Sequence, residues 1–318
     1  ASRAAAVCAI GLGRVTADVL ARLVQIDRER GDVLAALDAS RLLTILDASD
    51  PDWRRYRAQL LAETGRPSAA EAIYRQALAA APTDAQSWLG LGNVLATGGR
   101  AGAAASAYET AWILGERTPA VAEGIAGLEQ RDGNLVAAVR WLERAEALER
   151  DVDGRRALRR ARLLASSGQE VEALRVAEAV VAAAPSPGLA AEARVLCATL
   201  TLRADRVDEA LAHMDAARAA GVIDAALEES AGRTLYVRRD FGGSAVRLAR
   251  AAAAAGDTDP DLLELLASAR IRAGDLEEAR EAIVAYIERR SMDDAARALV
   301  ADWRSAKRRA EAGDRGPR

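Results

Sequence analysis

The sequence predicts an all-α protein built as a linear array of helix pairs, and three observations lead to that prediction. Alanine, leucine and arginine, which favour helices, are abundant among the 318 residues, while only 3% are aromatic. Glycines and small residues recur at a spacing of 34 residues over most of the chain. This length is large for one globular core and ordinary for an array in which each repeat contacts its neighbours.

The 34-residue period is strict in the first half of the chain and looser in the second. Each repeat has a glycine, or in two repeats an aspartate, followed five residues later by an alanine. The strict pairs are Gly31 with Ala36, Gly65 with Ala70, Gly99 with Ala104, and Gly133 with Ala138. The looser pairs are Gly168 with Ala173, Asp205 with Ala210, Asp240 with Ala245, and Gly274 with Ala279. Eight repeats are therefore expected to start near Ala17, Pro51, Ala85, Pro119, Gly154, Ala191, Ala226 and Pro260.

Each repeat is expected to hold two helices of about a dozen residues. The glycine ends the first helix, because a left-handed backbone costs little only for glycine and, less so, for asparagine and aspartate. The stretch "GRPSAAEAIYRQALAAAP" at 65–82 is interpreted as a second helix that ends at Pro82. Its Ala70, Tyr74 and Ala77 fall on one face, where small residues let two helix backbones approach closely.

The most regular repeat, "DAQSWLGLGNVLATGGRAGAAASAYETA" at 84–111, resembles the tetratricopeptide repeat family. The resemblance rests on Trp88, Leu91, Gly92, Leu95, Ala104, Tyr108 and Ala111 at the family's signature spacing. It covers roughly residues 17–293 and implies a right-handed superhelix of helix pairs with a concave groove. Repeats six and seven depart most from the pattern, and Arg160 and Arg233 stand where the family carries small or apolar residues.

The segments outside the regular array have their own predictions. Residues 1–16 include "AAAVCAIGLG", about half the length of a membrane helix. They are expected to form an N-terminal helix on the first repeat, or else to be the stub of a trimmed anchor or signal. "PSPG" at 185–188 suggests a bend near 185–190. Residues 294–318 are expected to form a capping helix and a basic tail, which would cover the last apolar face of the array.

Residue content argues against an enzyme. His213 is the one histidine, which leaves no histidine-ligated metal site and no histidine-based triad. Cys8 and Cys197 are far apart, and Cys197 is expected to be a buried small side chain. No glycine–lysine pair exists for a phosphate-binding loop. We therefore expect no catalytic residues, no metal, no cofactor and no small-molecule substrate. A net charge of −3 does not indicate a nucleic-acid-binding surface.

The resemblance places the binding surface on the first helix of each repeat, at its second, fifth, sixth, ninth and twelfth positions, called groove positions below. The predicted peptide-binding residues are Arg55, Tyr56, Gln59, Asn93, Arg155, Arg159 and Arg162. Gly90 and Gly124 also occupy groove positions. They either make room for a ligand or reflect tight packing.

The three arginines at 155, 159 and 162 share one helix face. One interpretation is a solvated face with salt bridges to neighbouring glutamates, and the other is a site for an acidic segment. Asn93, Arg155 and Arg159 match three of the five positions of the family's carboxylate clamp, whereas Leu89 and Gly124 do not match the other two. The resemblance thus implies at most a looser preference for an acidic peptide or C-terminus.

Two functions stay open at this point. The first is a non-enzymatic scaffold that binds a protein or peptide partner in the groove or on the convex face. The second is a structural subunit docked permanently in a larger complex, with membrane association only through the N-terminal segment. A cytoplasmic location is expected, with a periplasmic or membrane-tethered one as the alternative. The excess of arginine over the single Lys307 is attributed to a biased, bacterial genome composition.

Overall fold

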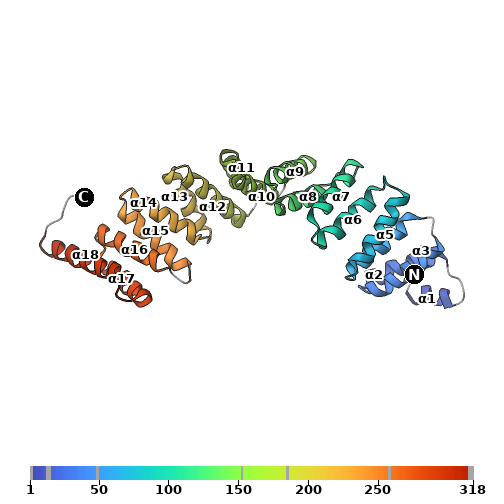
Figure 1. The fold of residues 1–318 in the computed structure, drawn as a ribbon, viewed down its shortest axis with the longest axis horizontal. Coiled ribbons are helices and arrows are strands. Elements are labelled where there is room, and N and C mark those ends of the chain that lie inside the picture. The colour runs from blue at the N-terminus through green and yellow to red at the C-terminus, as the bar shows by residue number, and fades with distance from the viewer. Residues whose placement is uncertain are drawn as a thin grey trace. The chain divides into compact units, whose positions relative to one another are not determined.

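The computed structural model describes residues 3–11, 16–47, 50–151, 153–183, 186–256 and 259–313, and every regular element in them is an α-helix (Figure 1). The first helices of the eight repeats are α2 (Ala17–Glu29), α4 (Pro51–Glu63), α6 (Ala85–Thr97), α8 (Pro119–Arg131), α10 (Arg155–Ser166), α12 (Pro187–Arg203), α14 (Ala225–Val237) and α16 (Pro260–Ala273). The second helices are α3 (Val33–Leu46), α5 (Pro67–Ala80), α7 (Ala101–Ile113), α9 (Leu135–Leu148), α11 (Glu170–Ala183), α13 (Val207–Ala219), α15 (Phe241–Ala254) and α17 (Leu276–Arg290). The predicted all-α array of eight helix pairs is confirmed.

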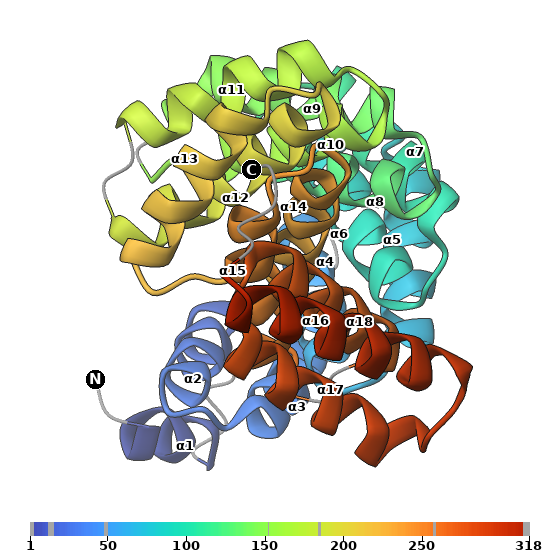
Figure 2. The same ribbon diagram turned by 90° about the vertical axis from the view of Figure 1, so that its left-hand side faces the viewer.

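The chain forms two compact units, and each is described by itself. The N-terminal unit, Ala1–Asp151, holds α1 to α9, and the C-terminal unit, Val152–Arg318, holds α10 to α18. Within each unit the two helices of a repeat pack side by side, and each second helix also packs on the first helix of the next repeat (Figures 1 and 2). Each repeat thus buries its apolar face against its neighbours.

Small residues mark the close helix contacts, as the period predicts. The alanine five residues after the turn has no exposed surface in seven repeats: Ala36, Ala70, Ala104, Ala138, Ala173, Ala210 and Ala279. Tyr74 and Ala77, on the same face of α5, are also buried. The interpretation of residues 65–82 as a second helix with a close-packing face is confirmed.

The turns inside the repeats use the left-handed backbone region, and one of them corrects the predicted phase. Gly65 has a φ of 75°, and Asp205 adopts a φ of 61° in the place of glycine, as expected. In repeat seven the left-handed residue is Arg239, with a φ of 66°, and not Asp240. Asp240 instead caps α15, where its carboxylate accepts a hydrogen bond from the Gly243 amide at 2.9 Å.

The one-residue shift resolves the packing of repeat seven. Ser244 takes the small position, fully buried, and its hydroxyl donates to the Gly232 carbonyl at 2.8 Å. Gly232 therefore faces the second helix, while Arg233 points away and pairs with Glu229 at 2.7 Å. The assignment of Arg233 to a small or apolar position was wrong, because the repeat begins one residue earlier than the sequence spacing indicates.

Repeat seven holds a buried ion pair, which also reaches repeat six. Arg247 of α15 is 6% exposed and lies 3.4 Å from Glu228 of α14, which is 2% exposed. The same guanidinium reaches Asp215 of α13 at 2.8 Å. An unpaired charge in the core would be costly, but each of these buried charges has an oppositely charged partner.

Two helices flank the repeats. α1 (Arg3–Gly11) packs on α2 with Ala6 buried, and Cys8 lies exposed. None of the described helices is long and apolar enough to cross a bilayer. α18 (Asp294–Glu311) packs on α16 and α17 as the predicted capping helix, and the indole N–H of Trp303 donates to the Leu276 carbonyl at 2.7 Å.

Part of the predicted bend and of the predicted tail lies outside the described residues, namely 184–185 and 314–318. The additional residues of this longer repeat lengthen its first helix, because α12 has 17 residues from Pro187 onward. The bend near 185–190 and the division at 1–16, 17–293 and 294–318 stay predictions.

The close contact at Ala104 gives a stability test. Ala104→Leu should lower the free energy of unfolding by about 1–3 kcal/mol, because a larger side chain overpacks the helix crossing. Ala103→Leu, at an exposed neighbouring position of α7, should change it much less. Thermal and urea denaturation of both variants measure the difference, and equal losses would show that the assigned face of α7 is wrong.

Candidate functional site

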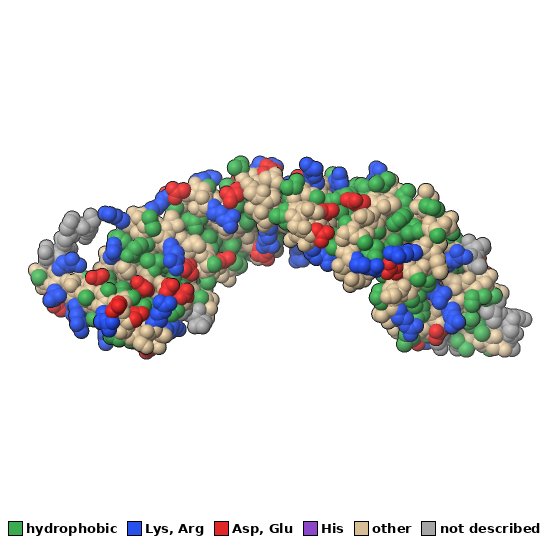
Figure 3. All heavy atoms as spheres, viewed as in Figure 1, with side chains coloured by type: hydrophobic (Ala, Val, Ile, Leu, Met, Phe, Trp, Pro, Cys, Tyr) green, Lys and Arg blue, Asp and Glu red, His purple; other side chains and the backbone are tan. Residues whose placement is uncertain are grey.

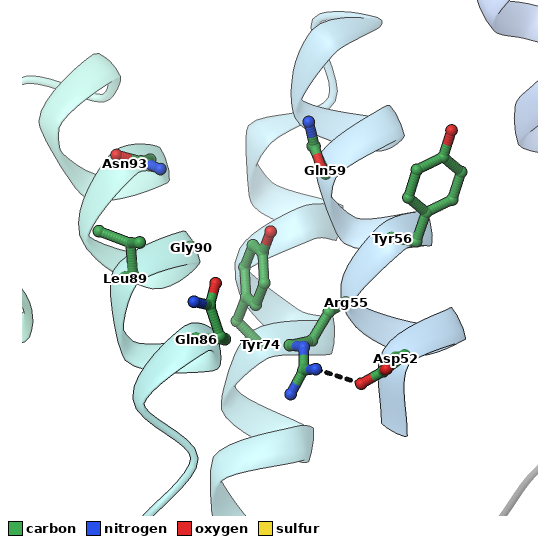
Figure 4. Close-up of a pocket in the computed structure, with 9 residues that line it drawn as sticks. All are labelled: Asp52, Arg55, Tyr56, Gln59, Tyr74, Gln86, Leu89, Gly90 and Asn93. Atoms are coloured by element: carbon green, nitrogen blue, oxygen red, sulfur yellow. Dashed lines mark hydrogen bonds and ion pairs between the residues drawn. The ribbon is translucent and has the colours of Figure 1, made fainter. Parts of the chain in front are cut away.

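Groove positions of α4 and α6 converge on one pocket in the N-terminal unit (Figure 4). This cavity, called the α4–α6 pocket, has a volume of about 440 Å³. Its lining residues are Asp52, Arg55, Tyr56, Gln59, Tyr74, Gln86, Leu89, Gly90 and Asn93. The structure therefore brings together four of the seven residues predicted from the sequence, namely Arg55, Tyr56, Gln59 and Asn93.

Tyr74 is part of this pocket although it belongs to a second helix, and the sequence analysis did not include it. A Cβ atom on Gly90 would lie 2.3 Å from the Tyr74 ring, so the ring occupies the space that a side chain on Gly90 would need. At Gly124 a Cβ atom would lie 3.6 Å from the Tyr108 ring, which is an ordinary contact distance, so that position has room for one. Gly90 therefore reflects tight packing against Tyr74, whereas the two explanations stay open for Gly124.

Arg55 is neutralised within the chain. Its guanidinium bonds both carboxylate oxygens of Asp84 at 2.8 Å and also pairs with Asp52. Burial alone would raise the pKa of Asp84, but hydrogen bonds from Ser87 and Arg55 outweigh it and hold that pKa below its ordinary value. Two carboxylates therefore surround one guanidinium, and Arg55 does not offer a free positive charge to an acidic ligand.

The amide side chains of the pocket are oriented by neighbours. Gln59 donates to Glu63 at 2.9 Å, and Gln86 donates to Glu116 at 2.6 Å. Both carbonyl oxygens are left with no partner among the described residues. Asn93 accepts a hydrogen bond from the Tyr108 hydroxyl at 2.7 Å, which leaves its amide N–H groups as donors.

Tyr74 is the most buried of the polar residues that line the pocket, and its hydroxyl has no protein partner in the described part of the chain. The residue is 5% exposed, and no hydrogen bond joins its hydroxyl to the described residues. Figure 4 shows the ring standing between α4 and α6, with the hydroxyl directed toward the level of Gln59 and Asn93. Burial raises the pKa of Tyr74, so the hydroxyl keeps its proton at neutral pH and can donate or accept.

A second cavity of the N-terminal unit lies beside the first, over α2. It has a volume of about 760 Å³ and includes Arg22, Gln25, Arg28 and Tyr56 among its lining residues. The Arg28 guanidinium lies 5.3 Å from the centre of the Tyr56 ring and donates to the Tyr56 hydroxyl at 3.4 Å. Tyr56 therefore lines both cavities. The sequence analysis did not select the groove positions of the first repeat, although the same 34-residue spacing indicates them.

The three predicted arginines of α10 lie in the C-terminal unit. Arg155 and Arg162 line a cavity of about 700 Å³ between α10 and α12, while Arg159 is half-buried and is not among its lining residues. Arg155 lies 3.6 Å from Asp153, and Arg162 pairs with Glu192 at 2.8 Å. Asn93 belongs to the other unit, so its grouping with these arginines in one clamp stays a prediction.

The reactive residue types do not assemble into a site in the described part of the chain. Cys197 has no exposed surface, and burial raises its pKa to about 11, so the thiol stays protonated and packs as a small apolar group. His213 of α13 is half-buried, and burial lowers its pKa. Among the described residues no three histidine, cysteine or acidic side chains lie close enough to hold a metal ion. Basic and acidic side chains are interspersed on the visible face of both units (Figure 3).

Comparison with known proteins found a family match in the N-terminal unit. The family model for the tetratricopeptide repeat matches residues 22–85 and 57–122. Residues 22–122 are thus similar to tetratricopeptide repeats. The matched residues hold α4, α5 and α6, so the α4–α6 pocket lies within recognised repeats. No curated protein matches the sequence significantly.

Solved structures share the fold at low sequence identity. YrrB, described as a tetratricopeptide repeat protein with an unusual peptide-binding site, is 22% identical over 58% of this chain and 93% of its own, with a TM-score of 0.51. A tetratricopeptide repeat protein from Parabacteroides merdae is 15% identical over 79% of this chain and 97% of its own, with a TM-score of 0.50. A chain of the Naa15/Naa10 complex bound to HypK-THB is 19% identical over 88% of this chain and 43% of its own, with a TM-score of 0.62. These likenesses support the solenoid of tetratricopeptide-type helix pairs.

The contact between Gly90 and Tyr74 gives a second stability test. Gly90→Ala should lower the free energy of unfolding by about 1–3 kcal/mol, because the new methyl group overlaps the Tyr74 ring. Gly102→Ala is the matched control, since Gly102 lies in α7 and a Cβ atom placed on it would have no neighbouring atom within 4 Å. That control should be neutral or stabilising by up to about 1 kcal/mol. Urea denaturation measures both, and a harmless Gly90→Ala would contradict the close contact.

Asp84 gives a pH-dependent test. Because its folded pKa lies below the unfolded value of about 3.9, its charge stabilises the fold above that pH, and the stabilisation is lost as pH falls through the folded pKa. Asp84→Asn should lower the free energy of unfolding by about 1–3 kcal/mol at pH 7. The loss should shrink as the pH falls below about 4. Asp302→Asn, at an exposed residue of α18, should cost little at either pH. Urea denaturation at both pH values measures the losses, and a pH-independent loss at Asp84 would contradict the stated role of its charge.

Proposed function

We propose that the chain is a non-enzymatic scaffold that binds an extended segment of a partner protein along the groove positions of its first helices. The observation that carries this proposal is the α4–α6 pocket, where groove positions of two consecutive repeats meet in one cavity. A repeat array offers such positions in succession, which suits a segment of several residues rather than a compact small molecule.

The polar groups of this pocket support main-chain and side-chain recognition. Gln59 and Gln86 present carbonyl oxygens, and Asn93 presents amide donors, each held by a hydrogen bond on its other end. Polar groups that are already oriented lose little rotamer freedom on binding. An extended segment has main-chain N–H and C=O groups that match such donors and acceptors.

The arginines of α10 are the proposed contact for acidic groups of the partner. Arg155 is 82% exposed at its side chain, and its distance of 3.6 Å to Asp153 leaves it available for a stronger carboxylate contact. Arg162 is half-exposed, and its partner Glu192 is equally accessible, so that salt bridge is an exposed one of modest strength. A carboxylate of the partner could therefore replace Asp153 or Glu192.

A second proposal is a structural subunit docked in a larger complex, and one observation favours it. The second helix of the first repeat, α3, exposes large apolar side chains away from the groove positions. They are Leu34 at 60%, Leu42 at 50%, Ile45 at 68% and Leu46 at 53% exposure. Such a cluster is typical of a protein-contacting surface. We propose a cytoplasmic location, in keeping with two free cysteines, and a periplasmic or membrane-tethered location through the N-terminal segment is the alternative.

The arginine face gives a binding test. Replacement of Arg155, Arg159 and Arg162 by glutamine should abolish recovery of the partner from lysate of the native host, while helical circular dichroism stays intact. Each lost charge-assisted contact is worth roughly 1.5–3 kcal/mol. Recovery by the parent should also weaken with salt.

The matched control replaces Arg175, Arg218 and Arg280 by glutamine, because these exposed arginines lie on second helices of the same unit. Quantitative mass spectrometry compares the proteins recovered by the parent and the two variants. If the α10 variant and the control recover the same partners as the parent, α10 does not contact the partner and the α3 surface becomes the preferred site.

A further inference from the structure

We propose that the α4–α6 pocket binds a cationic side chain, lysine or arginine, of the partner segment. This inference rests on the proposed scaffold function and specifies the chemistry of its first contact. It also separates the two groove regions, because the α10 arginines suit acidic groups while this pocket suits a basic one. Three observations lead to it: the local charge, the free acceptors and the Tyr74 hydroxyl, which has no protein partner among the described residues.

Local charge favours a cation. Carboxylates hydrogen-bond to lining residues on every side: Asp84 to Arg55, Glu63 to Gln59, and Glu116 to Gln86. Asp52 lines the pocket itself. The positive charges in the same set are those of Arg55 and of Arg28, which reaches Tyr56 and Glu63. Four carboxylates against two guanidinium groups leave this part of the groove negative, so a cation is attracted and an acidic ligand is repelled.

The free hydrogen-bonding groups are mainly acceptors. Glu63 and Glu116 accept hydrogen bonds from the amide nitrogens of Gln59 and Gln86, so each glutamine carbonyl oxygen stays an acceptor with no partner among the described residues. Asp52 uses one carboxylate oxygen for Arg55, and no contact within the described structure occupies the other. An ammonium group has three donors and no acceptor, and a guanidinium has five donors. Either one satisfies this set, whereas a carboxylate of the partner would find mainly other acceptors.

The Tyr74 hydroxyl is the independent indication of a ligand. Tyr74 is only 5% exposed, yet its hydroxyl oxygen remains accessible and has no protein partner in the described structure, so it is open to the cavity and free to bond a ligand. The ring is held over Gly90, where no side chain intervenes, so the hydroxyl faces the cavity rather than the helix interface. Its oxygen can accept from a cation, and Tyr56 lines the same cavity.

The test uses the full chain and a random library of 12-residue peptides displayed on phage. Peptides selected on the parent should be enriched in lysine or arginine at one position. Binding of the best synthetic peptide is then measured by fluorescence anisotropy, together with the same peptide carrying glutamine at its basic position. Gln86→Lys should weaken binding about tenfold or more, and Gln86→Glu should strengthen it several-fold, because each changes the charge beside the bound cation.

The controls carry the same charge changes elsewhere. Gln76→Lys and Gln76→Glu, at an exposed position of α5 outside the pocket, should change binding less than about twofold. Tyr74→Phe keeps the ring on Gly90 and should keep the melting temperature of the parent, because the hydroxyl has no partner to lose. It should still weaken binding about tenfold, the loss of one hydrogen bond to a charged group.

Each outcome has one meaning. Basic enrichment together with opposite effects of the two Gln86 variants supports the cation site. Enrichment in acidic residues, or equal binding to the parent and to Gln86→Lys, overturns it while the scaffold proposal stands. If no peptide is recovered from the library, and the α10 variant and its control recover the same proteins as the parent, both the cation site and the groove-binding proposal fall.

Discussion

The contact of two helix backbones at small residues is the constraint on which the structure depends. The second helices α5, α7 and α9 each carry an alanine with no exposed surface near their start, on the face that packs against the first helix. These residues are Ala70, Ala104 and Ala138. A larger side chain at such a position would separate the helices, with the loss of dispersion contacts on both sides. Because the small residue recurs every 34 residues in the strict part of the array, successive first helices present equivalent positions. The groove positions of α4 and α6 meet in one pocket for this reason.

The glycine and tyrosine pairs extend the same constraint to the groove surface. Tyr74 packs through the space at Gly90, and Tyr108 lies against Gly92, where a Cβ atom would be 2.5 Å from the ring. A side chain of a second helix thereby reaches the surface formed by first helices. This arrangement gives the pocket a rigid aromatic wall with a polar tip. Rigid aromatic groups lose little conformational entropy when they bind, which suits a recognition surface.

The fold could be predicted from the sequence because its determinants are local and periodic. A glycine at 65, a small residue at 70 and a proline at 82 each act within a few residues, so their spacing shows the helix pairs directly. The phase of repeat seven was mispredicted because Arg239 adopts the left-handed turn conformation, which the preference for glycine, asparagine and aspartate does not anticipate. Tertiary packing of Ser244 and Gly232 outweighs that local preference.

The candidate site was predictable only in part. The family resemblance implied the groove positions, and the structure places Arg55, Tyr56, Gln59 and Asn93 around one pocket. Their charge state was not predictable, because the carboxylate that holds Arg55 belongs to Asp84 of the next repeat and the partner of Gln86 is Glu116 of the turn after α7. Both contacts join residues about one repeat apart in the sequence, and the repeat spacing does not show which side chains meet. Tyr74 was missed for the same reason, although the order of a tyrosine and then a glycine at a groove position is a usable signal.

The account is tested most directly by measuring whether Tyr74 contacts Gly90 in solution. Nuclear Overhauser effects between the Tyr74 ring protons and the Gly90 α-protons, recorded on the isotopically labelled full chain, report it without any substitution. The account predicts strong cross-peaks and Gly90 α-protons shifted from their ordinary values by the ring current, because a Cβ atom on Gly90 would lie 2.3 Å from the ring. Absent cross-peaks, with Gly90 α-protons at ordinary shifts, would contradict the close helix contact and the pocket that is built on it.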